Sequence, residues 1–200
     1  MDSPIVKSII ETKLPTSFGT FNMRAYPSGI NDFPHLALFT EGVDPINVID
    51  VRIHSECMTG DVFSSAKCDC GDQLNYSMEW VQKNQGVVIY LRQEGRGIGL
   101  IKKLEAYNLQ EEGYNTLEAN LKLGFHGDQR NYDVVVSILE DLNINKIRLL
   151  TNNPEKVDAF EHSSIEVVER LPIEVIPNET NIGYLRTKKE DMGHLFSNFE

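Results

Sequence analysis

The chain has 200 residues, 40% of them hydrophobic and 24% charged, which is the composition of a globular protein with a buried core. No apolar run reaches the roughly 20 residues of a membrane-spanning helix, and the first residues lack the pattern of a signal peptide. We therefore expect a cytoplasmic protein with no membrane partner. The formal net charge of -11 argues against a nucleic-acid partner, because clustered Lys and Arg bind phosphate backbones.

The first half of the chain is predicted to be rich in β-structure. Short or alternating apolar runs predict strands over residues 18–25, 35–40 and 48–53, with turn-forming residues between them. Residues 72–83 carry apolar side chains at helical spacing. A compact β-branched run over residues 86–91 predicts a buried strand.

Helices and strands alternate in the second half. Helices are expected over residues 98–112 and 132–142, a strand over 146–151, a helix opened by Asn153 and Pro154, a short strand at 167–168, and a loop with a helix over 178–197. This alternation predicts an α/β fold, and the β-rich N-terminal part makes its sheet mixed, with flanking helices. Because no linker or repeat divides the chain, we expect a single domain over residues 1–200.

All three cysteines fall within one short segment, at Cys57, Cys68 and Cys70. They are too few for a disulfide scaffold, and three protein ligands plus a water is the arrangement of a catalytic zinc. Two alternatives stay open at this point. In the first, the cysteines are small buried hydrophobic side chains that bind no metal. In the second, His54 or Asp61 supplies a fourth ligand, and the zinc site is structural.

Three segments have the composition of anion-binding turns. The first, residues 52–56, leads directly into Cys57, and the second, residues 92–99, is a glycine-rich turn between a strand and a helix. The third, residues 151–156, combines a hydroxyl, two amides and a lysine at a helix start. Backbone amides at such turns, and the helix that follows, favour phosphate. Taken singly, the third turn is better explained as an ordinary capped helix start, and Arg96, Arg130 and Lys156 as solvated surface charges. The convergence of three such turns beside the cysteines favours an anion site.

Four blocks of the sequence together resemble the GTP cyclohydrolase II family. They read RIHSECMTGDVFSSAKCDCGDQL, RQEGRGIGL, GYNTLEANLKLGFHGDQRNY and LLTNNPEK, and they occur in the order and spacing of that family. The resemblance covers most of the chain from Arg52 to Lys156. It implies a homodimeric enzyme that uses one zinc ion per chain, and Mg²⁺ with the triphosphate of its substrate GTP.

The resemblance also implies roles for individual residues. Cys57, Cys68 and Cys70 are expected to bind zinc, with Asp128 as proton acceptor, Arg130 as nucleophile and Tyr107 in ring opening. Contacts with GTP are expected from Arg52, Ile53, His54, Ser55, Glu56, Gln73, Glu94, Gly95, Arg96, Thr116, Thr151 and Lys156. We further infer that Glu94 accepts hydrogen bonds from N1–H and the 2-amino group of guanine.

The implied reaction is hydrolysis of the imidazole ring of GTP, in the first step of riboflavin biosynthesis. Water activated by zinc attacks C8, which leaves as formate, and pyrophosphate leaves separately. The product is 2,5-diamino-6-(5-phosphoribosylamino)pyrimidin-4(3H)-one. A guanidinium stays protonated in proteins, so electrostatic stabilisation is as good an interpretation of Arg130 as covalent attack.

Several alternatives remain at the level of the sequence. Tyr107 is also compatible with a half-buried helix aromatic, and Asp128 with an N-cap before a helix over residues 131–142. The acidic net charge argues against a zinc-containing nucleic-acid-binding module. A related protein that stops at a formamide intermediate, or one that binds GTP without catalysis, would share the four blocks.

Overall fold

The computed structural model describes residues 6–29, 33–125, 130–190 and 192–196 of the chain. It falls into two compact units. The sheet unit comprises Met1–His54, Asn75–Arg92 and Asn131–Ile173, and the cysteine unit comprises Ser55–Leu74, Gln93–Arg130 and Glu174–Glu200. A single-domain organisation over residues 1–200 stays a prediction.

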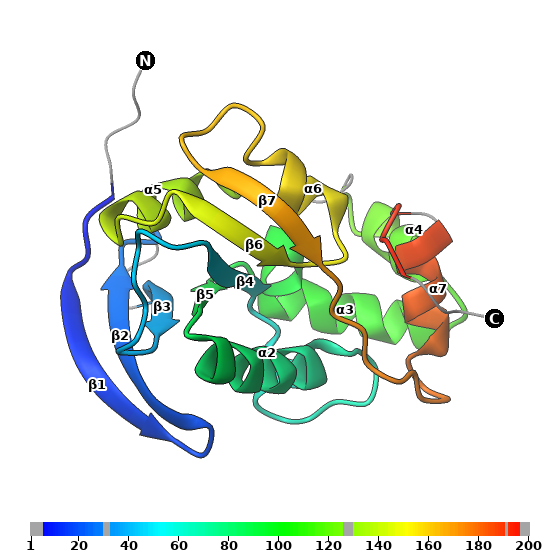
Figure 1. Ribbon diagram of the computed structural model, residues 1–200. Coiled ribbons are helices and arrows are strands. Elements are labelled where there is room, and N and C mark those ends of the chain that lie inside the picture. The colour runs from blue at the N-terminus through cyan, green and yellow to red at the C-terminus, as the bar shows by residue number, and fades with distance from the viewer. Residues whose placement is uncertain (1–5, 30–32, 126–129, 191, 197–200) are drawn as a thin grey trace. The chain divides into compact units, whose positions relative to one another are not determined.

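A seven-stranded mixed sheet forms the sheet unit (Figure 1), as the sequence predicts. Its order is β1-β2-β3-β5-β4-β6-β7, with β1 Ile10–Thr16, β2 Gly19–Tyr26, β3 His35–Phe39, β4 Ile49–Ser55, β5 Val87–Leu91, β6 Lys146–Leu150 and β7 Glu166–Leu171. Strands β1, β2, β3 and β5 pair antiparallel in that order, whereas β4, β6 and β7 pair in parallel. The α/β fold class is therefore confirmed.

Among the strands of the described residues, β1 alone was not predicted from the sequence. Its first four residues, from Ile10, are exposed, so the strand lacks the alternation that reveals a half-buried strand. It exists because it pairs with β2 along its whole length, from Ile10 opposite Ala25 to Thr16 opposite Gly19. Long-range pairing thus overrides a weak local pattern.

The core of the sheet unit lies at its central strands. Val51 and Ile53 of β4 and Val87, Ile89 and Leu91 of β5 are fully buried. Helix α5, Asp133–Asp141, covers them with Val135, Ile138 and Leu139, which follow the helical spacing seen in the sequence. Helix α6, Pro154–Asp158, follows β6, and the longer helix α2, Cys70–Asn84, precedes β5.

The cysteine unit contains short helical elements. These are α1 Met58–Asp61, the 3₁₀ turn η1 Glu94–Gly97, α3 Gly99–Glu111, α4 Thr116–Lys122 and α7 Ile182–Glu190. Helix α3 contacts η1 and α4, and α4 contacts α7. Helix α4 was not predicted, although Asn115 and Glu118 form a capping box at its start. Among the described residues, no helix has both the length and the apolar character needed to cross a membrane.

Candidate functional site

The three cysteines lie together in the cysteine unit. Cys57 precedes α1, Cys68 lies in the loop that follows, and Cys70 begins α2. Their sulfur atoms are all within 4.8 Å of one another, and Cys57 Sγ lies 3.6 Å from Cys68 Sγ. Zinc bound about 2.3 Å from each thiolate in a tetrahedral site would place the sulfurs about 3.8 Å apart. The donor set and its spacing therefore fit zinc.

Two glycines permit this close approach of the loops. A Cβ on Gly60 would lie 3.0 Å from Cys68 Sγ, and a Cβ on Gly71 would lie 2.4 Å from the carbonyl oxygen of Gly60. A side chain on Gly71 would displace the backbone of Gly60, and one on Gly60 would crowd Cys68 and Cys70. The close packing of the cysteine segments therefore requires glycine at position 71 and favours it at position 60.

Asp61 and His54, the two alternative fourth ligands, have other contacts. The carboxylate of Asp61 accepts a hydrogen bond from the backbone N–H of Cys57 at 2.9 Å. Its oxygens do not belong to the cluster of possible metal ligands that the three sulfur atoms form. Asp61 thus holds the backbone of one cysteine. His54, in the sheet unit, stacks its ring on Tyr90 with the ring centroids 5.4 Å apart.

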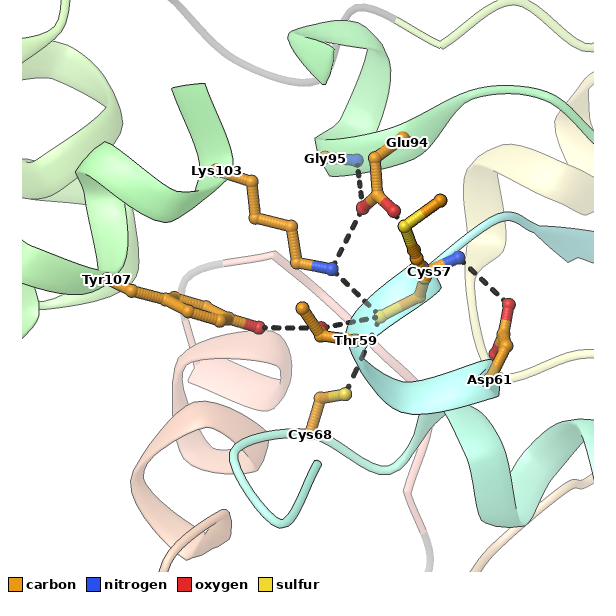
Figure 2. Close-up of polar contacts among 9 residues, drawn as sticks. Cys57, Thr59, Asp61, Cys68, Glu94, Gly95, Lys103 and Tyr107 are labelled. Carbon is orange, nitrogen blue, oxygen red and sulfur yellow. Dashed lines mark hydrogen bonds and ion pairs between the residues drawn. The ribbon is translucent and has the colours of Figure 1, made fainter. Parts of the chain in front are cut away.

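Lys103 places a positive charge on the cysteine cluster (Figure 2). Its ammonium donates to Cys57 Sγ at 3.0 Å and to Glu94 Oε1 at 2.8 Å. Hydrogen bonds from the Cys68 and Cys70 thiols, together with Lys103, lower the pKa of Cys57. The hydrogen bond to Cys57 raises the pKa of Cys68 to about 11, so negative charge forms first on Cys57.

Glu94 links the cluster to the glycine-rich turn. Its Oε1 also accepts from the backbone N–H of Gly95 at 2.8 Å, and its Oε2 accepts from the backbone N–H of Met58 at 2.6 Å. Three donors thus already share the carboxylate, which has about four lone-pair directions. Accepting both N1–H and the 2-amino group of guanine would require Lys103 or a backbone amide to move.

Tyr107 lies one helical turn after Lys103 on α3. Its hydroxyl is 3.3 Å from Thr59 Oγ1, which is in turn 3.7 Å from Cys57 Sγ (Figure 2). Burial raises the pKa of Tyr107 to about 12. The phenol is therefore protonated at neutral pH, which makes it a proton donor beside the cysteine cluster.

The glycine-rich turn adopts a left-handed backbone. Gly95, Arg96 and Gly97 have φ values of 61°, 63° and 93°. Glycine adopts this conformation freely, but for Arg96 it is unfavourable and must be held by its surroundings. The two glycines thus permit the backbone shape of this turn, and binding of an anion by its backbone amides stays a prediction.

In the sheet unit, five predicted GTP contacts lie toward the carboxyl ends of the interior strands β4 and β6. Arg52 on β4 lies opposite Leu150 on the parallel strand β6, and its guanidinium donates to the carbonyl of Leu150 at 3.0 Å. The Lys156 ammonium, which is buried, donates to the carbonyl of Ile53 at 2.8 Å. The residues that lie in the second half of β4 or after the end of β6 are Arg52, Ile53, His54, Thr151 and Lys156. Ligands of α/β sheets bind at the carboxyl ends of strands.

The capped-helix interpretation of residues 151–156 also holds. Asn153 accepts from the backbone N–H of Glu155 at 3.0 Å and caps α6, with Pro154 in the first turn. Thr151 Oγ1 accepts from the backbone N–H of Asn153 at 3.0 Å. The turn is an ordinary helix start that also carries the buried Lys156.

The remaining predicted residues belong to the cysteine unit. Gln73 is buried and donates to Asp69 Oδ2 at 2.6 Å, and Thr116 begins α4. Asp128 lies outside the described residues, whereas Arg130 lies within them. The helix expected over residues 131–142 begins at Asp133 with Tyr132 at its N-cap, so the N-cap interpretation of Asp128 is wrong.

Comparisons with known proteins decide the family. A sequence model described as GTP cyclohydrolase II matches residues 7–172. This chain belongs to the GTP cyclohydrolase II family. The GTP cyclohydrolase-2 of Shewanella halifaxensis and that of Shewanella pealeana are each 47% identical over 193 residues, which cover 96% of this chain and 92% of theirs.

A further relative is longer. The riboflavin biosynthesis protein RibBA of Chlorobium phaeovibrioides is 47% identical over 196 residues, which are 98% of this chain but 48% of that protein. This chain thus spans about half the length of RibBA. Among solved structures, RibBX, a two-domain 3,4-dihydroxy-2-butanone 4-phosphate synthase from A. baumannii, reaches a TM-score of 0.43 at 20% identity, over 83% of this chain and 40% of RibBX.

Sequence reasoning missed Lys103, Thr59 and Asp69 as parts of the cysteine site. Lys103 precedes Tyr107 by four residues on a predicted helix, a spacing that puts both side chains on one face. Asp69 stands between two predicted ligands. Both positions were thus visible in the sequence, but their partners across the fold were not.

Proposed function

We propose that this protein is a zinc-dependent GTP cyclohydrolase II that releases formate and pyrophosphate from GTP and acts first in riboflavin biosynthesis. The product would be 2,5-diamino-6-(5-phosphoribosylamino)pyrimidin-4(3H)-one. The observation that carries this proposal is the cluster of three free cysteines beside Lys103 and Tyr107 in a chain of this family.

Cys57, Cys68 and Cys70 would hold the zinc ion. Thiolates are soft ligands that favour zinc over magnesium, and three of them leave a fourth position for water or substrate. When bound there, zinc supplies a Lewis acid that makes water nucleophilic near neutral pH, which suits hydrolysis at C8 of guanine. Mg²⁺ would accompany the triphosphate, where oxygen ligands are available.

Tyr107 would handle a proton during ring opening. Its hydroxyl is protonated at neutral pH and lies next to Thr59, which contacts the cysteine cluster. Opening the ring leaves negative charge on an imidazole nitrogen, and a phenol held in this position can donate to that atom. Asp128 would accept a proton in the same reaction.

The main role of Glu94 would be that of a positioning residue, in addition to its contact with GTP. It ties Lys103 to the backbone at Met58 and Gly95, so the glycine-rich turn and α1 keep one arrangement. Other contacts of the cysteine unit with GTP would come from Ser55, Glu56, Gln73, Gly95, Arg96 and Thr116.

Positive side chains would serve the triphosphate. In the sheet unit these are Arg52 and Lys156, with Thr151, Ile53 and His54 beside them. Arg130 would stabilise the leaving pyrophosphate or attack the α-phosphate. An Arg130→Lys variant separates these two roles. Pyrophosphate release near the wild-type rate excludes an obligatory guanidinium nucleophile. Loss of pyrophosphate release while GTP still binds supports a guanidinium nucleophile.

Quantifying formate and pyrophosphate together, with GTP and Mg²⁺, tests the proposal. The expected result is equal amounts of both products, lost in a Cys68→Ser variant that keeps the circular dichroism spectrum of the wild type. Pyrophosphate without formate would mean a phosphohydrolase on this fold. Bound GTP without either product would mean a GTP-binding protein that is not an enzyme.

We also propose a cytoplasmic homodimer, on the strength of the family resemblance and of three cysteines that are free rather than paired. Light scattering on the purified protein tests the oligomeric state. A mass of twice 22.7 kDa supports the dimer, and a mass of 22.7 kDa contradicts it.

A further inference from the structure

Helix α7, Ile182–Glu190, lies beyond residue 172, where the match to the family ends. Nothing in the sequence pattern of this helix suggests a role in the reaction. Tyr184 and Lys188 are four residues apart on it, so they share one face. The Lys188 ammonium lies 4.5 Å from the centroid of the Tyr184 ring.

Lys188 makes a buried ion pair with the cysteine loop. Its ammonium donates to Asp69 Oδ1 at 2.6 Å, and the two side chains are 9% and 1% exposed. The second carboxylate oxygen of Asp69 accepts from Gln73 Nε2 at 2.6 Å. Asp69 is therefore fixed on both sides, by α7 and by the first turn of α2.

The ion pair is important because Asp69 lies between two of the three cysteines. Asp69 is the single residue between Cys68 and Cys70, so its backbone belongs to the segment that sets the spacing of both sulfurs. A carboxylate that is almost fully buried needs a compensating charge. Without Lys188, the buried Asp69 carboxylate would lose this counter-charge and would turn toward solvent, which would move the backbone of the adjacent cysteines.

Tyr184 extends the same face of α7 to the glycine-rich turn. The guanidinium of Arg96 lies 5.9 Å from the centroid of the Tyr184 ring. Arg96 is the residue in that turn whose left-handed backbone must be held by its surroundings. One helix face thus contacts both the cysteine loop and the turn that carries Arg96.

We propose that Lys188 is a positioning residue of the metal centre, acting through Asp69 on Cys68 and Cys70. This inference rests on the proposed function, because it takes the cysteine cluster to be a zinc site. Partners that orient metal ligands in this way typically change metal affinity by about 10- to 100-fold when removed. The effect of Lys188 should therefore appear in metal binding itself, before any catalysis is measured.

The test compares Lys188→Met with Lys188→Arg and with Arg186→Met, which removes one positive charge from an exposed position of the same helix. Zinc release to a chromogenic chelator is followed for each protein. The thiolate-to-metal charge-transfer spectrum is recorded after cobalt loading. We expect Lys188→Met to release zinc at least about tenfold faster and to shift the cobalt spectrum. Lys188→Arg should restore both readouts, and Arg186→Met should match the wild type.

A double variant distinguishes positioning from general loss of folding. In an Asp69→Asn background the buried anion is gone, so Lys188→Met should add little to the rate of zinc release. If Lys188→Met does not fold, the same comparison is made between Asp69→Asn and wild type, and faster zinc release from a folded Asp69→Asn is the expected result.

Folded Lys188→Met that releases zinc at the wild-type rate with an unchanged cobalt spectrum would overturn the inference and leave the proposed function intact. If Lys188→Met does not fold, zinc release from Asp69→Asn at the wild-type rate would likewise overturn the inference and leave the proposed function intact. A wild-type protein that binds no zinc would overturn both.

Discussion

The substitution Lys103→Met should destabilise the metal-free protein markedly. It keeps the length of the side chain but removes the ammonium that contacts Cys57 Sγ at 3.0 Å and Glu94 Oε1 at 2.8 Å. The Lys103 and Glu94 side chains are only 12% and 10% exposed. Removing one partner of a fully buried pair costs about 3–5 kcal/mol, and the remaining exposure reduces this to roughly 2–3 kcal/mol.

Urea unfolding followed by circular dichroism measures this cost. With a slope of about 2 kcal/mol per molar urea, the midpoint should fall by roughly 1–1.5 M. Lys102→Met is the matched control, because the neighbouring Lys102 pairs with Glu105 at 2.7 Å while both side chains are more than 40% exposed. An exposed pair contributes about 0–1 kcal/mol, so this midpoint should move little. Equal shifts in the two variants would refute the importance of the buried contact.

Two further predictions concern catalysis and pH. Tyr107→Phe keeps the ring but loses the proton donor, so formate release should fall by about 10²- to 10⁴-fold with zinc content unchanged, and near-normal formate release would exclude a role for the hydroxyl. Burial lowers the pKa of His35, whose Nδ1 accepts from the backbone N–H of Arg92 at 3.0 Å, below its usual 6.5. The unfolded chain then takes up this proton more readily, so stability should fall as the pH drops below about 6.5. Thermal unfolding from pH 8 to pH 5 checks this, and a His35→Gln variant with the same pH dependence would contradict it.

Local patterns in the sequence predicted the elements that bury a regular apolar face. Helix α5, with Val135, Ile138 and Leu139 inside, and the compact strand β5 both match their expected positions. Such elements are visible because periodic apolar residues must face one core. Strand β1 has exposed residues over its first half, and only its pairing with β2 reveals it.

The site was predictable in its chemistry but not in its connections. Cys57, Cys68 and Cys70 lie close together in the sequence, and the fold brings their sulfurs together as expected. The charges that hold this cluster are distant in sequence: Lys103 is 46 residues from Cys57, and Lys188 is 119 residues from Asp69. No local periodicity encodes such a pairing, because it depends on how separate helices pack.

The most direct test of the cysteine cluster as the centre of ring hydrolysis is formate release measured against zinc occupancy. Protein stripped of metal under reducing conditions is reloaded with zinc in steps, and the initial rate of formate release from GTP is measured at each step. The account predicts a rate that rises in proportion to zinc up to one ion per chain and is close to zero without it. Formate released at an undiminished rate by zinc-free protein would contradict the account.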